Sequence, residues 1–411
     1  MERNDQIFNS MTRKIPEIRP DLQIIQVRDQ NRDVLVFYDS MGYVPQHFAL
    51  DATVRPLLSL FNGAFSLEEI SRQINGDLKK EEILGFIQLL DEHSILNSPR
   101  YQEQRDQTET KFEQSDVRPA TFAGVSYPDN PEDLSVFLGM DDAITSTKIS
   151  THSDIHALYA PHLDIKAARN QYVEAFTKIS HLKPSRVLFL ATAHYTGYYN
   201  RFYDDYPFIG SKKSFEVAGR TFHADHEILD ILQQDSLKNG FTLKDRAHRV
   251  EHSIEIHLLY ASQIWQHDFK IIPILTGSFD ELFYHTSGDL ATKIEHFTNS
   301  LSSLTDEDTF VLISGDLSHV GKKFGDKKPA SQFRENVEKY DHQFLNYASQ
   351  ANTNSLLKHV SQEFDATRIC GFPPLYTYLN LGLKKSGDLL NYYWWDEKET
   401  QSAVSIGSIL F

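Results

Sequence analysis

The stretch FVLISGDLSH, residues 310–319, shows the pattern that decides the fold of most of this chain. Four apolar residues lead directly into Ser314, Gly315 and Asp316, and His319 follows three residues later. Three similar apolar runs are IHALYA at 155–160, VLFLATA at 187–193 and FKIIPIL at 269–275. Continuous apolar runs of this length, separated by amphipathic segments, are typical of strands buried on both faces. We therefore predict an α/β fold in which helices flank a sheet.

A histidine or an aspartate follows three of these predicted strands. His162 follows the run at 155–160 after one proline, His194 follows the run at 187–193, and Asp316 follows the run quoted above. In open α/β sheets the ligand site lies beyond the carboxyl ends of the strands. Imidazole is a ligand for zinc, iron, copper and nickel, and a carboxylate adds an anionic oxygen. The pattern predicts a metal site at one edge of the sheet.

Each of these residues also has an ordinary structural explanation. A single histidine after a strand is most often a hydrogen-bonded loop residue, and Asp316 could cap a helix that follows it. Cys370 precedes Gly371 and an apolar helical segment. Its thiol could be a metal ligand, a nucleophile or a small buried side chain. A potential metal ligand follows three separate predicted strands, and this repetition favours a metal site over three unrelated structural roles.

A second cluster of titratable side chains lies in VEHSIEIHLLY, residues 250–260. The apolar residues of this segment could face the core from a helix. Glu251, His252 and Glu255 would then lie at the start of that helix, as a general base or as partners of a metal ligand. His252 and His257 are five residues apart, so this is not the zinc-protease pattern H-E-x-x-H. A solvated, charged helix start is the alternative interpretation.

Composition limits the class of protein and of partner. The chain has 411 residues and a net charge of −16, which disfavours binding to nucleic acids and to anionic membranes. No run approaches the roughly 20 apolar residues of a membrane span, and the N-terminus has no apolar secretory core. The single cysteine excludes an intramolecular disulfide. We expect a cytoplasmic protein, and the sequence does not specify its oligomeric state.

A polar stretch divides the chain into two blocks. Residues 101–117 contain few apolar side chains, which predicts a linker between residues 1–100 and residues 118–411. The first block begins with apolar runs that predict two strands, at 22–27 and 33–38. Helical spacing follows in three segments: 50–61, the segment opened by the capping box Ser66-x-x-Glu69, and 80–92. These elements suggest a small winged-helix module.

The first block resembles the PqqD-like domain, a peptide-recognition module. The resemblance rests on RPDL at 19–22 and LDATVRPLLSLFNGAFSLEEI at 50–70. It implies that residues 1–100 bind a leader-like peptide along the edge of a strand. A DNA-binding winged helix is the rival interpretation, but 11 basic residues against 15 acidic ones in this block count against it. A structural or dimerisation module is the third possibility.

The second block resembles the Memo family, known in microbes as AmmeMemoRadiSam system protein B. The motifs, in chain order, are RPATFAGVSYPDNPEDL at 118–134, APH at 160–162, LATAH at 190–194, EHSIEIHLLY at 251–260, SGDLSH at 314–319 and CG at 370–371. The resemblance implies a fold similar to class III extradiol dioxygenases, which hold non-haem iron. The metal-site residues that it implies are His162, His194, Asp316, His319 and Cys370. It also places Glu251, His252 and Glu255 along the same cavity.

The chain departs from the family pattern beside two of these residues. Leu163 and Asp164 stand where Ala and Gly are usual, so Asp164 could add a carboxylate beside the site. Tyr195 follows His194 where a second histidine is usual. The pocket wall therefore differs, and a substrate is not carried over from the family.

Three functions fit these residues. The one we expect is a non-haem iron enzyme that acts with dioxygen on a peptide or a small aromatic substrate. His162 and His194 would bind Fe(II), with Cys370 or Asp316 as the anionic ligand, and a thiolate ligand would also suit copper. The residues expected to move protons are His319, His252, Glu251, Glu255 and Tyr195. The alternatives are a zinc-type hydrolase, because His/His/Cys plus water is a catalytic zinc pattern, and a non-catalytic metal- and peptide-binding protein.

Overall fold

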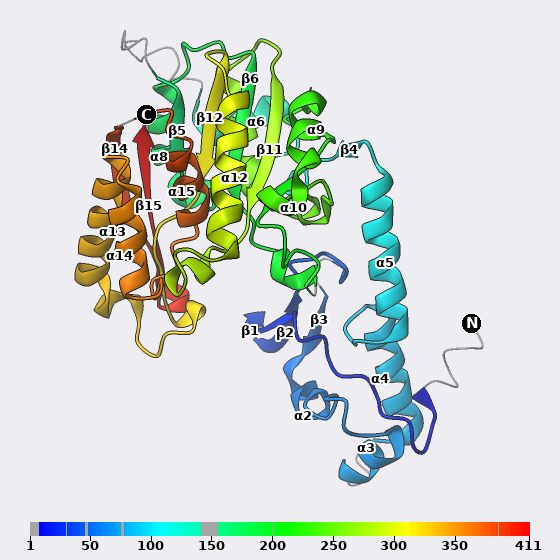
Figure 1. The fold of residues 1–411 in the computed structure, drawn as a ribbon. Helices are drawn as coiled ribbons and strands as arrows, with labels where there is room; N and C mark the ends of the chain where they lie inside the picture. The colour runs from blue at the N-terminus through cyan, green and yellow to red at the C-terminus, as the bar shows by residue number, and fades with distance from the viewer. Residues whose placement is uncertain are drawn as a thin grey trace. The chain divides into compact units, whose positions relative to one another are not determined.

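The computed structural model of the chain describes residues 8–29, 31–45, 48–74, 78–140, 155–199, 201–384 and 386–411. The chain divides into two compact units, Met1–Gln114 and Ser115–Phe411, coloured from blue to cyan and from cyan to red in Figure 1. Each unit has its own hydrophobic core. Among the described residues, no helix combines the length and the apolar character needed to cross a membrane.

The first unit combines an antiparallel sheet with short helices. Its elements are β1 (Gln23–Asp29), β2 (Arg32–Tyr38), β3 (Ala49–Asp51), η1 (Ala52–Val54), α2 (Arg55–Leu58), α3 (Leu67–Gln73), α4 (Lys80–Glu92) and α5 (Pro99–Gln114). The two predicted strands, the helix at 80–92 and the capping box of Ser66 and Glu69 are confirmed. The helix predicted at 50–61 is only partly correct, because its first residues pair with β2 as strand β3.

The segment expected to be a linker is largely a helix, α5. The prediction rested on its low content of apolar residues, yet Tyr101 and Phe112 are both buried. The guanidinium of Arg19 lies 4.2 Å from the centre of the Tyr101 ring, and Tyr43 donates a hydrogen bond to the buried carboxylate of Glu109. A few well-placed contacts within the first unit therefore order a helix whose other residues are polar.

The second unit is built on a large mixed sheet. Its strands are β5 (Ala157–Ala160), β6 (Arg186–Thr192), β7 (Phe208–Gly210), β10 (Phe241–Thr242), β11 (Lys270–Thr276), β12 (Thr309–Ser314), β13 (His319–Gly321), β14 (Asp388–Glu397) and β15 (Ser402–Leu410). The strand order is β10-β7-β11-β6-β12-β5-β15-β13, with β14 paired to β15. The central strands β11, β6, β12 and β5 are parallel, as the four apolar runs predict. Their residues are almost all buried, which explains why the runs lack polar alternation.

Helices and short segments complete the second unit. The longer helices are α6 (Pro131–Leu138), α8 (Ile165–Thr177), α9 (His226–Gln234), α11 (Ser253–Ile264), α12 (Asp289–Leu304), α13 (Arg334–Ser349), α14 (Thr353–Gln362) and α15 (Phe372–Asn380). The shorter elements are β4 (Val117–Arg118), η2 (Thr196–Tyr199), β8 (Ser214–Val217), β9 (Arg220–Phe222), α10 (Ser236–Asn239), η3 (Arg246–Arg249), η4 (Asp280–Phe283), η5 (Lys322–Phe324), η6 (Ala330–Gln332) and η7 (Lys398–Thr400).

Two helices, α11 and α15, begin at the carboxyl edge of the central strands. Figure 1 shows α15, beside α12, in front of the sheet, and α15 packs against β6, β11 and β12. Helix α11 packs against α8, β6, β8 and β12 and is buried almost all around, rather than along one stripe as its pattern predicted. The segments just before α11 and α15 contain Glu251, His252 and Cys370.

Candidate metal centre

The ends of three adjacent parallel strands bring the predicted residues to one place. The order β6-β12-β5 places His194, Asp316 and His162 at the same edge of the sheet, each two residues beyond the end of its strand. Cys370, which precedes the N-cap of α15, reaches the same edge. The structure thus brings these side chains, from distant parts of the second block, together at one edge of the sheet.

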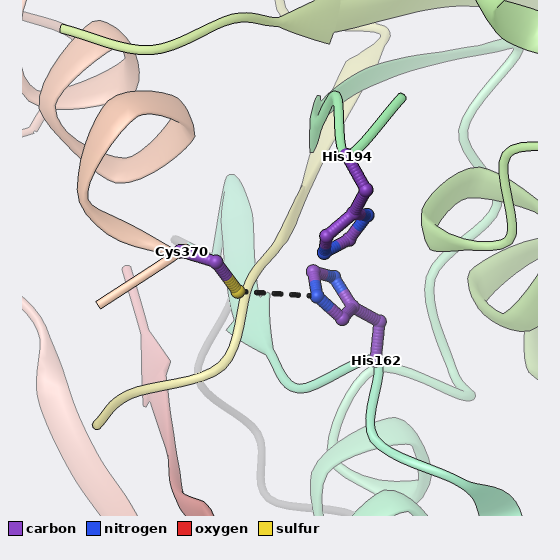
Figure 2. Close-up of side chains that lie close together, drawn as sticks. All are labelled: His162, His194 and Cys370. Carbon is purple, nitrogen blue, oxygen red and sulfur yellow. Dashed lines mark hydrogen bonds between the residues drawn. The ribbon is translucent and has the colours of Figure 1, made fainter. Parts of the chain in front are cut away.

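The donor atoms of His162, His194 and Cys370 are close enough to share one metal ion. One nitrogen of each histidine and the cysteine Sγ all lie within 4.8 Å of one another. Figure 2 shows Cys370 Sγ facing the imidazole of His162, 3.3 Å from its Nε2. A tetrahedral metal with bonds of about 2.0 Å to nitrogen and about 2.3 Å to sulfur would hold these two atoms about 3.5 Å apart. The arrangement therefore fits a metal of ordinary bond lengths.

Hydrogen bonds at Nδ1 fix the tautomers of the two imidazoles. His162 Nδ1 lies 3.1 Å from Ser314 Oγ, and that hydroxyl donates its one proton to the carbonyl of Ser253. Ser314 must then accept a proton from His162. His194 Nδ1 lies 2.9 Å from a carboxylate oxygen of Glu251, which can only accept. In both rings Nε2 is left to face the cluster, as in histidines that bind metals.

Glu251 and His252 border the cluster, as the sequence predicts. Besides His194 Nδ1, the Glu251 carboxylate accepts the backbone N–H groups of His194, His252 and Ser253. The His252 ring stacks on that of His194, with centres 4.7 Å apart, and burial lowers the pKa of His252 to about 4. Nitrogens of the two histidines and an oxygen of Glu251 form a second group with metal-ligand spacing.

Asp316 and His319 also lie next to Cys370. Asp316 Oδ1 accepts the backbone N–H groups of His162 and Leu163, and its Oδ2 lies 3.9 Å from His162 Nε2. His319 Nδ1 donates to the carbonyl of Arg368, which leaves Nε2 free to accept. Donor atoms of Asp316, His319 and Cys370 form a third group with metal-ligand spacing. The five predicted metal-site residues are therefore neighbours.

Burial and neighbouring charges shift the acidities of the cluster in different directions. Burial, with the neighbouring imidazoles, lowers the pKa of His162 well below its usual value. Burial opposes a charge on His194, but the Glu251 carboxylate and the Cys370 sulfur together outweigh it and raise the pKa of His194 well above its usual value. Burial raises the pKa of Asp316 to about 7 and raises the pKa of the Cys370 thiol. Such divergent shifts in one cluster are typical of functional sites.

Three other predicted side chains have different surroundings. Glu255 accepts hydrogen bonds from Arg118, Tyr127 and the backbone of Thr121 and Phe122, so both its oxygens are used outside the donor groups. The Tyr195 ring centre lies 6.1 Å from that of His194. Asp164 caps the start of α8 through a bond to the backbone of Lys166 rather than adding a carboxylate to the donor groups.

The sequence analysis missed two residues that hold the site in place. Ser314 sets the tautomer of His162, although it was noted only as part of the strand end. Arg118 is 1% exposed and donates to the carbonyls of Glu251 and His248 as well as to Glu255. The signal for Arg118 was present, because it opens the motif RPATFAG, but its partners lie some 130 residues away.

Comparisons with known proteins agree with these motifs. A MEMO1 family protein of Aquifex aeolicus is 27% identical over 393 residues, covering 92% of this chain and 96% of the relative. MEMO1 family protein TTHA0924 of Thermus thermophilus is 24% identical over 353 residues, covering 84% of this chain and 98% of the relative. The crystal structure of the uncharacterized protein JW3007 from Escherichia coli K12 aligns over 62% of this chain and 99% of that one, at 15% identity and a TM-score of 0.35. The fold assignment does not rest on so weak a structural match.

The comparisons also show how much of the chain matches the family. The model of the family described as Memo-like protein matches residues 118–410, which is nearly the whole second unit. The alignment with the Aquifex aeolicus relative covers more of the chain than that match and so includes part of the first unit. The family model does not reach residues 1–100, so the resemblance of that block to the PqqD-like domain stays a prediction. The chain belongs to the Memo family.

Proposed function

We propose that the second unit holds one transition metal ion between His162, His194 and Cys370, and that the protein is a non-haem iron-dependent oxidoreductase. The observation that carries the proposal is the donor set. Two imidazoles whose Nδ1 protons already have acceptors lie with a thiol in one group of closely spaced donor atoms. Partners at Nδ1 hold a liganding histidine in the correct tautomer and orientation.

Fe(II) is the metal we expect, with Cu and Zn as alternatives. Asp316 Oδ2 lies 3.9 Å from His162 Nε2, and a carboxylate joining two histidines is the donor set of non-haem iron oxygenases. Cys370 as the anionic ligand would shift the preference towards copper or zinc, because a thiolate is soft. When bound, iron would supply electrons and open coordination positions for dioxygen and substrate.

Two side chains beside the donors are placed to move protons. The pKa of Asp316, raised by burial to about 7, allows this carboxyl to hold or release a proton near neutral pH. His319 Nε2 is an acceptor, because the Nδ1 proton is donated to the carbonyl of Arg368. With Cys370 as the anionic ligand, we propose that Asp316 and His319 exchange protons with the substrate. With Asp316 bound to the metal, His319 would do so alone. His252 and Tyr195, whose rings flank His194, would contact the substrate or assist this transfer.

Residues that follow His194 in the chain line a cavity with room for a substrate, although the donor residues themselves are not part of its wall. It has a volume of about 480 Å³, and its wall begins two residues after His194. The residues that line it include Thr196, Gly197, Arg201, Tyr203, Tyr206 and Lys293. This volume suits a small aromatic compound or a short stretch of peptide, and tyrosine rings pack well against aromatic groups.

A zinc-type hydrolase is the second candidate, because one of the donor groups is His/His/Cys. Three such ligands leave a fourth position for water in catalytic zinc sites. Asp316 would then act as the general base, since its raised pKa places its titration near neutral pH. The two candidates differ in the metal and in the need for oxygen, so the same experiment separates them.

The experiment is anaerobic purification followed by metal analysis and oxygen-uptake measurements with catechols and peptides. We expect about one iron per chain in the wild type. His162→Ala should lose it, whereas His226→Ala, which changes an exposed histidine on α9, should keep it. Substrate-dependent oxygen uptake that His162→Ala abolishes would support the oxidoreductase. Bound zinc with hydrolysis and no oxygen uptake would support the second candidate, and a wild type that binds no metal would contradict both.

For the first unit, we propose recognition of an extended, leader-like peptide by strand β1. Among the described residues, β1 pairs with β2 on one edge and with no strand on the other. Ile25 is 48% exposed and Val27 is 39% exposed, so the strand offers apolar side chains as well as free backbone groups. An extended peptide can add to such an edge as a further strand.

Fluorescence anisotropy with labelled peptides encoded beside this protein would test that proposal. Ile25→Lys and Val27→Lys should weaken binding, because they place charges along the edge that receives the peptide. Leu89→Lys is the matched control, since Leu89 is also an exposed apolar residue, at 36%, but lies on α4. Equal loss of binding in all three variants would contradict recognition at β1.

A further inference from the structure

His257 is a buried histidine close to the metal centre. It lies on α11, is 0% exposed, and packs its ring edge-to-face with Phe176. Its Nε2 lies 2.9 Å from the carbonyl oxygen of Pro161. A carbonyl oxygen can only accept, so Nε2 carries the proton and Nδ1 is an acceptor. Among the described residues, Nδ1 has no partner.

This arrangement is a poor source of stability. A typical hydrogen bond adds about 0.5–1.5 kcal/mol net, whereas a buried polar atom without a partner costs about 1–3 kcal/mol. The surroundings of His257 on α11 are largely apolar, with Ile256, Leu258 and Tyr260 also buried. An apolar residue of similar size would fill this position at lower cost. What the imidazole adds is therefore a defined position for the Pro161 carbonyl.

That carbonyl belongs to the peptide group that joins Pro161 to His162. The N–H of the same peptide group donates to Asp316 Oδ1 at 2.8 Å. His257 and Asp316 thus hold the two polar atoms of one peptide plane, in line with the end of β5. Because this plane sets the backbone from which the His162 side chain projects, fixing it fixes the direction of the imidazole.

Helix α11 connects this contact to the other ligand candidates. Its first residue, Ser253, accepts the proton of Ser314, which in turn accepts from His162 Nδ1. Glu251, two residues earlier, holds His194. One helix therefore aligns both imidazoles, and His257 supplies the contact to the backbone of the first.

We propose that His257 is a positioning residue, which holds the Pro161–His162 peptide so that His162 Nε2 points at the metal position. The inference rests on the proposed metal site. His257 lies outside the donor groups. We expect its replacement to change the metal affinity and the geometry of the metal-free site.

The test compares His257→Phe, which removes the N–H and keeps a ring, with His257→Gln, whose amide N–H can reach the same carbonyl. The matched control is His267→Phe, because His267 Nε2 lies 2.8 Å from the carbonyl of Pro184, before the start of β6 and far from its carboxyl end. Co(II) alone is the probe, followed by its visible spectrum. A second readout is the His162 Nδ1 proton in imidazole NMR spectra of the metal-free protein.

We expect His257→Phe to weaken Co(II) binding by about 10–100-fold, to change the thiolate-to-cobalt absorption and to lose the protected Nδ1 proton of His162. His257→Gln should restore all three, and His267→Phe should leave them unchanged. If His257→Phe does not fold, His257→Met takes its place. Wild-type affinity and an intact Nδ1 proton in a variant without the N–H would overturn the inference. If the wild type binds no Co(II), the proposed metal site fails, and the NMR comparison still decides the role of His257.

Discussion

Replacing Glu251 by glutamine removes one charge from the proposed metal centre and leaves the size of the side chain unchanged. In the wild type, Glu251 Oε1 accepts from His194 Nδ1 and from the backbone of His252 and Ser253, at 2.9, 3.0 and 3.2 Å. Oε2 accepts the backbone N–H of His194 at 2.8 Å. A glutamine amide has a single acceptor oxygen, so at least one of these four N–H groups would face an NH₂ group.

The structure gives the expected size of the effect. One buried N–H without an acceptor costs about 1–3 kcal/mol of unfolding free energy. The remaining hydrogen bonds weaken too, because bonds to a charged acceptor are about twice as strong as neutral ones. Removing a carboxylate that orients a liganding histidine lowers metal affinity about 10–100-fold, or about 1.4–2.8 kcal/mol. We therefore expect Glu251→Gln to lose both stability and metal affinity.

Glu255→Gln is the matched control, because Glu255 lies one turn further along the chain and is equally buried. Its partners are Arg118 and Tyr127 rather than a histidine of the cluster. Leaving the Arg118 guanidinium buried without its counter-charge should cost about 3–5 kcal/mol of unfolding free energy. Arg118 keeps its bonds to the carbonyls of His248 and Glu251, so metal affinity should stay near that of the wild type. Urea unfolding measures the first quantity, and competition with a chelating dye for Co(II) measures the second.

The two variants separate orientation of His194 from general destabilisation. If Glu255→Gln weakens metal binding as much as Glu251→Gln does, the loss follows stability and the role assigned to Glu251 is wrong. If Glu251→Gln binds the metal as tightly as the wild type does, the role assigned to Glu251 is likewise wrong.

Three further predictions concern other parts of the chain. Gly371→Ala would place a Cβ 2.3 Å from the Tyr159 hydroxyl, so the backbone next to Cys370 must move, and dye competition should show at least a tenfold weaker metal affinity. Arg19→Met should cost about 3–5 kcal/mol in urea unfolding, because it leaves the buried Asp39 carboxylate, 3.0 Å from the guanidinium, without its counter-charge. Burial raises the pKa of Asp341 to about 6, above its unfolded value, so the unfolded state loses this proton first and stability falls as pH rises from about 4 to 6. Asp341→Asn should remove that fall. Between pH 4 and pH 7 the unfolding free energy of the variant, measured with urea, should therefore rise by about 3 kcal/mol relative to that of the wild type.

The central sheet and the meeting of its strand ends could be predicted because both follow from local pattern. An apolar run such as VLFLATA has no polar face, so it must be buried on both sides, and parallel strands bring their carboxyl ends to one edge. The residue types at those ends, His162, His194 and Asp316, then limit the chemistry. Nothing in this inference required a contact between particular side chains.

What could not be predicted depends on long-range partners. Glu251 and Glu255 look equivalent in the sequence, yet one holds His194 and the other holds Arg118, 137 residues earlier. The polar segment 101–117 seemed unable to order itself, but a helix needs only a few buried residues if another surface receives them. Whether a helix is buried all around, as α11 is, depends on elements that pack against it from both sides.

The partners of the two Nδ1 protons, Ser314 and Glu251, have a consequence for how the protein is loaded. They belong to the polypeptide, so the pocket is formed before any ion arrives. Small domains organised by zinc alone unfold when a chelator removes it. Here a chelator should lower the melting temperature and leave the chain folded, because saturation at a hundred times Kd adds only about 2.7 kcal/mol. At the proposed metal site, one ion could then replace another without unfolding, and the supply of metals around the protein would decide which one is bound.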